Sequence, residues 1–340
     1  MVQAQDIGHD EPKGVDDPLY DRRDLSDKEL LKVLRELRRR LLRRPEVAKA
    51  VRELTRPIGS RDFYVSLGCL VGGAAGQAFA VTYAPFLIPA FLFVQLMGLA
   101  GVHSLAHESW HRRSHPNERV DRAISRCFVG PVMLGSNEAH RADHVLHHKM
   151  PGEPQDPSSV IWELTDDEFM GRIRERLLIL PAIVRIVRLW TTGASAVRRG
   201  DQAGHRMDAA TLGPVVVVHA LWALPLLAAS VPAFLVGYVL PLPLGSIFAQ
   251  LREYREHARF PDGRTAVYDI LCNEFERVLV PGGYFNLHAL HHAFPEIPQR
   301  RLPELYRVLE RSVDMEKEYY GLSPQIGLKR SYFKHHPLPV

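Results

Sequence analysis

Two long stretches of the chain contain no charged side chain. The first runs from Phe63 to Val102 and the second from Ala209 to Leu251. Each is about twice the ~20 residues that one membrane-spanning helix needs, and each is interrupted by a turn signal, at 82–85 and at 230–232. We therefore expect four spanning helices in two hairpins, at about residues 63–81, 85–102, 212–230 and 232–251. The alternative is a pair of buried hairpins in a soluble helical bundle, where uncharged runs of this length are rare.

The charges that flank these stretches predict how the chain is oriented. Lys and Arg are frequent before the first stretch and within 112–206 and 252–330, whereas the short turns near 82 and 231 have none. The positive-inside rule then predicts that both termini lie on the cytoplasmic side of the cell membrane. The fold class expected is an all-α, multi-pass membrane protein with a cytoplasmic helical cap. Residues 59–320 would form this membrane domain, and 321–340 a C-terminal tail.

The N-terminal region shows a different pattern. Residues 1–20 are rich in Asp, Gly and Pro, which predicts disorder. Within 21–58, leucines at 30, 34, 37 and 41 recur at helical spacing among Arg and Lys, with a break near Pro45. This basic amphipathic segment is predicted to lie on the membrane surface. The apolar segments 127–135 and 177–190 are too short or too basic to span a bilayer and are also predicted to be surface helices.

Composition adds four observations to this picture. The mean hydropathy of −0.13 averages two uncharged hairpins with a charged remainder. The three cysteines, Cys69, Cys127 and Cys272, form no CxxC pair, which argues against a disulfide framework or a cysteine-ligated metal. The net charge of +4 is placed around the spans, so we expect a lipid bilayer and no nucleic acid as its partner. Seventeen histidines, by contrast, are unusually many for 340 residues.

Most of these histidines cluster where the predicted spans end. His103, His107 and His111 follow one another at helical spacing, and the pattern HxxHH occurs at 144–148 and again at 288–292. Imidazole is a good ligand for iron, zinc and copper. Nine or ten convergent histidines exceed the four ligands of a structural zinc and suit two metal ions with open positions, as in iron–oxygen chemistry.

Acidic and amide residues nearby are candidates to hold the second ring nitrogens. These candidates are Glu253, Glu256, Asp143, Asp156 and Asn286. A competing interpretation takes His107 to His111 as the HExxH of a zinc peptidase, with Glu108 activating water, but it leaves both HxxHH patterns unused. His219, inside the third span, is expected to pack or hydrogen-bond, and a metal transporter would need more ligands at that depth.

Taken in order, four segments resemble the membrane fatty acid desaturase family of non-heme di-iron oxidases. They are LAHESWHRRSHPNERVDRAISRC, HRADHVLHHKMPGEPQDP, LREYREHARF and NLHALHHAFPEIPQRRLPELYRVL, and the resemblance runs from about Leu105 to Leu309. It implies a di-metal site in the cap. The ligands it implies are His107, His111, His144, His147, His148, His257, His288, His291 and His292, with His103 as an alternative ligand in the first segment.

The same resemblance implies an activity. The expected protein is an oxidoreductase with two Fe and O2 as co-substrate that introduces a double bond into a fatty acyl or other lipid chain. The alternative is a hydroxylase or desaturase of a small or carrier-bound specialised metabolite, which Glu253 mildly favours because some relatives carry Asn there. No HPGG heme-binding element is present, so electrons are expected from an external ferredoxin- or rubredoxin-like carrier and its reductase.

Overall fold

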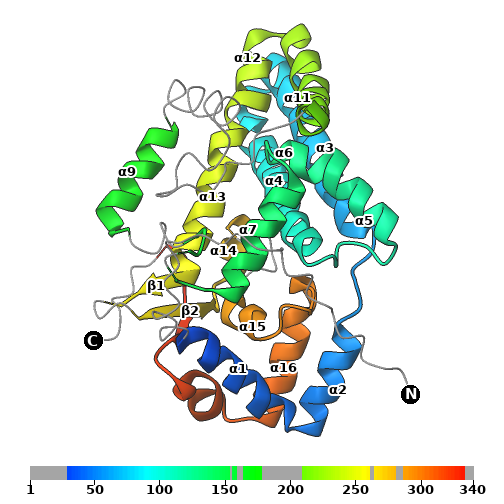
Figure 1. Cartoon of the computed structure of the whole chain (residues 1–340). Coiled ribbons are helices and arrows are strands. Elements are labelled where there is room, and N and C mark those ends of the chain that lie inside the picture. Colours follow the sequence, from blue (N-terminus) through cyan, green and yellow to red (C-terminus); the bar gives the residue numbers. More distant parts are fainter. Residues whose placement is uncertain are drawn as a thin grey trace, which may run out of the picture.

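The computed structural model describes residues 29–153, 155–158, 164–177, 209–260, 264–280 and 286–333. Within these ranges the chain is mostly helical, as expected, with long helices that extend away from a wider cap (Figure 1). The predicted disordered segment 1–20, nearly all of the predicted surface helix 177–190 and the end of the tail lie outside the described residues.

The two predicted hairpins are present. The first is α3 (Arg61–Tyr83) and α4 (Ile88–Trp110), joined by a 3-10 turn at Pro85–Leu87. The second is α11 (Ala209–Ala229), followed by a continuous helical run of α12 (Val231–Phe234), a π-turn (Leu235–Val239) and α13 (Pro241–Glu256). Among the described residues, four helices are therefore long and apolar enough to cross a membrane. Each hairpin reverses the direction of the chain, so both of its ends lie at the cap. These ends are residues 61 and 110 in the first hairpin and 209 and 256 in the second.

Glycine lets the two helices of the first hairpin approach closely. A Cβ atom at Gly98 would lie 2.6 Å from the backbone nitrogen of Leu70, and one at Gly73 would lie 2.7 Å from that of Gln95. Small residues at such crossings are the usual way in which membrane helices gain packing contacts.

Polar side chains connect the two hairpins inside this apolar bundle. Gln77 Nε2 donates to Gln95 Oε1, and Gln95 Nε2 donates to the carbonyl oxygen of Gly237 at 2.7 Å. Trp222 Nε1 donates to the same carbonyl at 3.0 Å. Gly237 lies in the π-turn, where the altered helical hydrogen-bond pattern leaves a carbonyl available to such side chains.

The cap is built from shorter elements after each hairpin. Those after the first are α5 (Glu118–Ile124), a π-turn (Ser125–Val129), α6 (Gly130–Val132), α7 (Asn137–Lys149) and α9 (Asp166–Leu177). Those after the second include α14 (Glu274–Leu279), α15 (His288–Ala293), a 3-10 turn (Gln299–Arg301), α16 (Leu302–Ser312), a π-turn (Met315–Tyr319) and a 3-10 turn (Tyr320–Leu322). Residues 129–132 are buried and α6 contacts α11, so this part of 127–135 packs inside the protein, not on a membrane surface as expected.

The N-terminal amphipathic segment differs from its predicted setting. It forms α1 (Glu29–Leu42) and α2 (Pro45–Leu54), with the break at Pro45 as predicted. Its apolar face is not available to a membrane, because Leu30, Leu34, Leu37 and Leu41 are at most 2% exposed and join the core of α15 and α16. An amphipathic pattern indicates only that one face of the helix is shielded from water. Here the core of the cap shields the apolar face of α1, and a membrane does not.

A small sheet, which the sequence analysis did not predict, completes the cap. Its strands are β1 (His257–Arg259), β2 (Thr265–Ile270) and β3 (Ile326–Lys329), in the order β1-β2-β3. β1 pairs antiparallel with β2, with His257 opposite Val267, and β2 pairs parallel with β3, with Val267 opposite Ile326. Every residue of β2 is buried. The sheet thus fixes the start of β1 at His257, directly after the fourth long helix ends at Glu256.

Candidate metal centre

Four elements bring nine histidines together beneath the first and second hairpins. They come from the end of α4, from α7, from β1 and from α15. On α7, His144 and His148 lie one turn apart on one face, while His147 lies on an adjacent face. On α15, His288 and His292 form the one-turn pair, and His291 lies apart. Each HxxHH therefore sends its i, i+4 pair to one group and its remaining histidine to the other.

The first group contains five histidines, namely His107, His111, His144, His148 and His291. One nitrogen of each lies within 4.8 Å of the corresponding nitrogen of every other member. His144 Nε2 lies 2.8 Å from His111 Nε2 and 3.1 Å from His148 Nε2. His291 Nε2 lies 3.0 Å from His148 Nε2. Both His107 and His111 belong to this group, whereas His103 does not.

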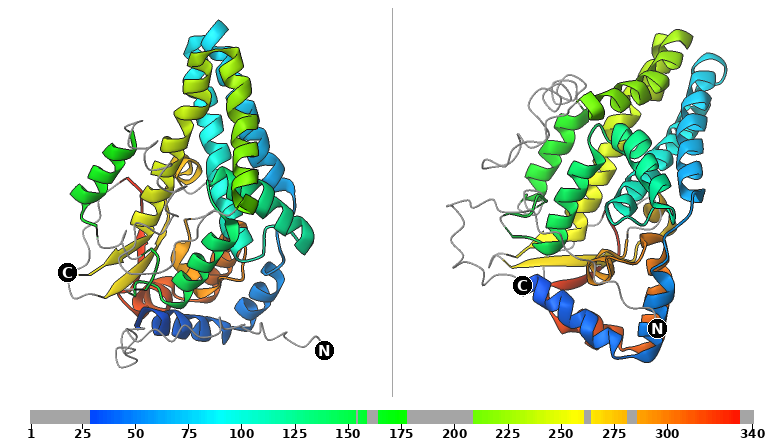
Figure 2. Two further views of the ribbon diagram at one scale, coloured as in Figure 1. Left: turned by 45° about the horizontal axis from the view of Figure 1, so that its top comes forward. Right: turned by 45° about the vertical axis from the view of Figure 1, so that its right-hand side comes forward.

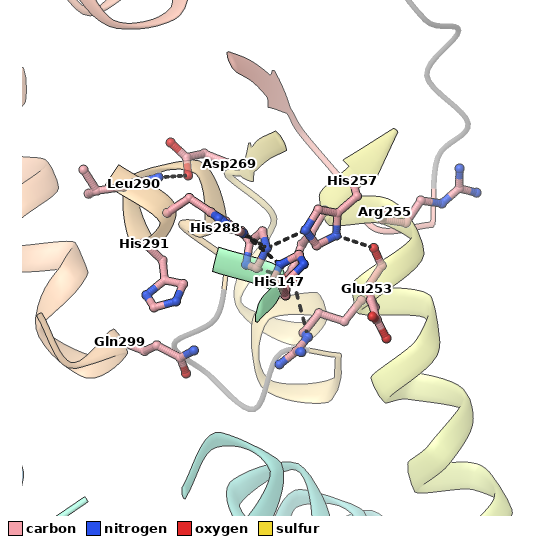
Figure 3. A network of polar contacts seen from close by, with 12 residues as sticks. His147, Glu253, Arg255, His257, Asp269, His288, Leu290, His291 and Gln299 are labelled. Carbon is pink, nitrogen blue, oxygen red and sulfur yellow. Dashed lines mark hydrogen bonds and ion pairs between the residues drawn. The ribbon is translucent and has the colours of Figure 1, made fainter. Parts of the chain in front are cut away.

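The second group contains four histidines, namely His147, His257, His288 and His292, all of them buried. His147 Nε2 lies 3.2 Å from His292 Nε2, and His288 Nε2 lies 2.9 Å from His257 Nε2 and 3.0 Å from His292 Nε2. Figure 3 shows the rings of His147, His257 and His288 close together, with the ring of His291 turned away from them.

These distances fit metal ions better than they fit hydrogen bonds. A ring nitrogen carries at most one proton, yet His144 Nε2 and His288 Nε2 each approach two other Nε2 atoms. Metal–nitrogen bonds of about 2.1 Å place neighbouring ligands about 3.0 Å apart in an octahedron and about 3.4 Å apart in a tetrahedron. The observed 2.8–3.2 Å separations are therefore close to the spacing expected between neighbouring ligands of one metal ion.

Burial keeps most of these rings in the neutral form that binds metal. It lowers the pKa of His144, His148, His257, His288, His291 and His292 well below 6.5, and repulsion from neighbouring rings lowers it further. Burial, with help from Arg113 and Arg141, lowers the pKa of His111 to about 3. His147 is the exception: burial lowers its pKa, but the charge of Asp156 and its hydrogen bond outweigh this and raise the pKa overall.

Three of the five residues predicted to hold the second ring nitrogens are seen in contact with a histidine of the two groups. Asp156 is buried and lies 3.0 Å from His147 Nδ1, and it also accepts from the backbone N–H groups of Gly152 and Ser158. Glu256 Oε2 lies 3.3 Å from His288 Nδ1. Glu253 acts through its backbone, because its carbonyl oxygen accepts from His257 Nδ1 at 3.0 Å (Figure 3). The hydrogen bonds of His147 and His257 fix the ring orientation and the tautomer of these two histidines.

The other predicted residues lie outside the two groups. Asn286 Nδ2 donates to the carbonyl oxygen of Ile270 at 3.1 Å, so it connects the start of α15 to β2. Asp143 is half-buried on α7. His103 lies one turn before His107 and lines a small cavity with Arg252 between α4 and α13. His219 is placed 3.0 Å from both Tyr238 Oη and the carbonyl oxygen of Pro131, which confirms a hydrogen-bonding role.

Two buried carboxylates position the helices that carry histidines, and sequence reasoning missed one of them. Asp269 on β2 accepts from the N–H of Leu290 at 3.1 Å and from the hydroxyls of Tyr319 and Tyr320 (Figure 3). Its signal was a lone charge within an otherwise uncharged strand. Glu108 accepts from the N–H of Gln299 at 2.8 Å, in front of α16. It is therefore engaged in the cap, which removes the water-activating role of the peptidase interpretation.

The chain was compared with known proteins. The sequence model of the family described as "Fatty acid desaturase" matches residues 82–323. This range contains all nine histidines and three of the four long apolar helices. No curated protein matches the chain significantly.

Proposed function

The chain belongs to the fatty acid desaturase family, and on that premise we propose that it is a membrane-bound, O2-dependent di-iron oxidase that introduces a double bond into a fatty acyl or other lipid chain. Membership itself makes the protein an oxidoreductase of the desaturase or oxidase type. The metal identity, the co-substrate and the substrate belong to the proposal.

The observation that carries the proposal is the pair of histidine groups. Five rings in one group and four in the other suit two metal ions, because one ring nitrogen of each histidine lies within 4.8 Å of those of the other members of its group. Iron bound there supplies the one-electron redox chemistry that O2 activation needs. All-histidine ligation without cysteine also suits iron over a thiolate-bound zinc.

The protein's own contribution is placement. α4 and α13 leave the apolar bundle immediately before His111 and His257, so the groups lie where a lipid chain in the bilayer can reach them. Desaturation removes two hydrogen atoms from adjacent carbons. With two electrons and two protons supplied from outside, these hydrogens reduce O2 to two waters. The residues around the groups select the C–H bonds by holding one part of the chain beside them.

Orientation and electron supply are part of the same proposal. The cap carries the basic segments and is proposed to face the cytoplasm, with both termini on that side. An external ferredoxin- or rubredoxin-like carrier with its reductase would then deliver the electrons from the cytoplasm.

The test combines metal content with product analysis. The full chain, purified in lipid nanodiscs, is expected to hold about two iron atoms and to form an unsaturated product from lipid extracts with O2, ferredoxin and reductase. His148→Ala should lose iron and turnover, because His148 lies within the first group. His103→Ala is the matched control and should keep iron, because His103 belongs to neither group.

Several outcomes would contradict the proposal. Zinc as the only metal, or full turnover by the His148→Ala variant, would exclude a di-iron centre built on these rings. If the sole product were an alcohol that carries 18O from labelled O2, the reaction at this site would be hydroxylation and not desaturation.

A further inference from the structure

The solvent face of α1 is strongly cationic. Residues 29–44 contain seven Lys or Arg and two Glu. Six of the basic side chains are exposed, namely Lys32, Arg35, Arg39, Arg40, Arg43 and Arg44. We call these six residues the α1 basic face.

Ion pairs neutralise only part of this face. Arg39 and Arg40 both pair with Glu36, and Arg44 pairs with Glu318 at 2.9 Å. Among the described residues, no ion pair involves Lys32, Arg35 or Arg43. At least three full positive charges are therefore presented to solvent along one helix, where they attract an acidic partner.

The position of this face argues against a lipid partner. α1 lies at the end of the molecule opposite the α11–α12 tip, beyond the cap (Figure 1). The views in Figure 2 keep α1 at that end, apart from the long apolar helices. The bilayer crossed by those helices is therefore not the surface that α1 faces, and its apolar side is already buried in the cap.

The opposite side of α1 rests on a helix of the metal centre. Arg38 Nη1 donates to the carbonyl oxygen of Ala293 at 3.0 Å, and its guanidinium lies 5.0 Å from the ring centroid of Phe294. Ala293 directly follows His292 on α15. Arg38 also forms a two-bond ion pair with Glu296. A single helix thus separates the α1 basic face from the segment that carries three of the nine histidines.

We propose that the α1 basic face is the docking surface for the acidic protein that delivers electrons to the metal centre. This inference rests on the proposed function, which needs two electrons from outside for each O2 reduced to two waters. Two one-electron carriers are oxidised per turnover, and the two protons come from solvent. Charge complementarity of this kind raises the association rate and fixes orientation, and binding here brings a carrier next to α15.

The test uses charge reversal in the full chain, in nanodiscs, with a plant-type [2Fe–2S] ferredoxin and its reductase as the probe. The variant Lys32→Glu/Arg35→Glu should raise the KM for ferredoxin on the order of tenfold. The affinity for oxidised ferredoxin, measured directly at low salt, should fall similarly. Turnover with dithionite as a chemical reductant should be unchanged, because neither residue contacts the histidine groups.

The matched control reverses two other exposed basic residues of the cap. Arg119→Glu/Arg126→Glu makes the same change in net charge on α5 and the π-turn after it, and it should leave the KM for ferredoxin near that of the unaltered protein. An equal rise of the KM for ferredoxin in both variants would show that only the net charge of the protein matters. This result would contradict the proposed docking surface on α1.

The outcomes separate this inference from the proposed function. Unchanged ferredoxin affinity in Lys32→Glu/Arg35→Glu overturns the inference, as expected if residues 1–28, with eight acidic and four basic side chains, already occupy the face. Preferential binding of an RNA or of anionic vesicles at this face would also overturn it. Face-dependent ferredoxin binding without any oxidation, even with dithionite, leaves the docking surface standing and rejects the oxidase.

Discussion

Each imidazole of the two groups has two nitrogens with different roles. One faces the group, and in His147 and His257 the other is held by the surrounding protein, through Asp156 and the carbonyl oxygen of Glu253 respectively. The neutral ring binds metal only if its proton stays on the outer nitrogen, so the outer acceptor fixes the usable tautomer.

Asp156→Asn tests this division. The amide weakens the acceptor for His147 Nδ1, and we expect the metal affinity of the second group to fall about 10- to 100-fold. Iron content after dialysis against a chelator should drop from about two atoms per chain toward one. Glu253→Gln is the control, because the contact of Glu253 with His257 uses the backbone carbonyl, which the substitution keeps. Equal iron loss in both variants would contradict the assigned role of Asp156.

The sequence predicts the histidine set better than its surroundings. The spacing of HxxHH places its rings on one side of a helix, and the structure brings all nine predicted histidines into two groups. The structure also separates His103 from these groups, a question that the spacing of His103, His107 and His111 left open. The role of Asp269 was missed, because it acts on α15 from a strand about twenty residues earlier, and the lone charge in that strand does not indicate its partner.

At the scale of elements, the first hairpin depends on the close approach of α3 and α4. Gly73→Ala is expected to destabilise it, because the new Cβ would meet the backbone of Gln95 at 2.7–2.8 Å, and backbone cannot move aside cheaply. Overpacking of this kind costs about 1–3 kcal/mol, which thermal unfolding in detergent would register as a lower Tm. Gly72→Ala is the control, since no atom lies within 4 Å of its Cβ. A normal Tm for Gly73→Ala would refute this packing.

Helices could be predicted with their surroundings where only one environment explains the pattern of apolar residues. An uncharged run of forty residues has few uses outside a membrane, and all four long apolar helices are present. The amphipathic pattern of α1 fits two environments, because a bilayer and a protein core are equally apolar. In the structure, the core formed with α15 and α16 covers the apolar face of α1. The short strands carry too few residues to show an alternating pattern.

At the scale of the whole molecule, the cap and the hairpin tips lie on opposite sides of the apolar bundle (Figure 1). The native Cys127 is exposed on the cap, so the proposed orientation can be tested in cells. A membrane-impermeant maleimide should label Cys127 only after the cells are permeabilised. Ser230→Cys, at the second hairpin tip, should be labelled in intact cells when the native cysteines are replaced by Ser. The reverse pattern would place the cap outside.

The positions of the histidines along the chain determine when each histidine group can be completed during protein synthesis. The first group is complete only when His291 has been made, and the second only when His292 has been made, although His107 was made nearly two hundred residues earlier. Both hairpins therefore enter the membrane before either group can close. Closure of the two groups is consequently a late step, and a chain truncated before α15 carries six or fewer of the nine rings, together with an α1 whose apolar face has lost its cover. Such a chain exposes the α1 leucines that the complete protein buries against α15 and α16.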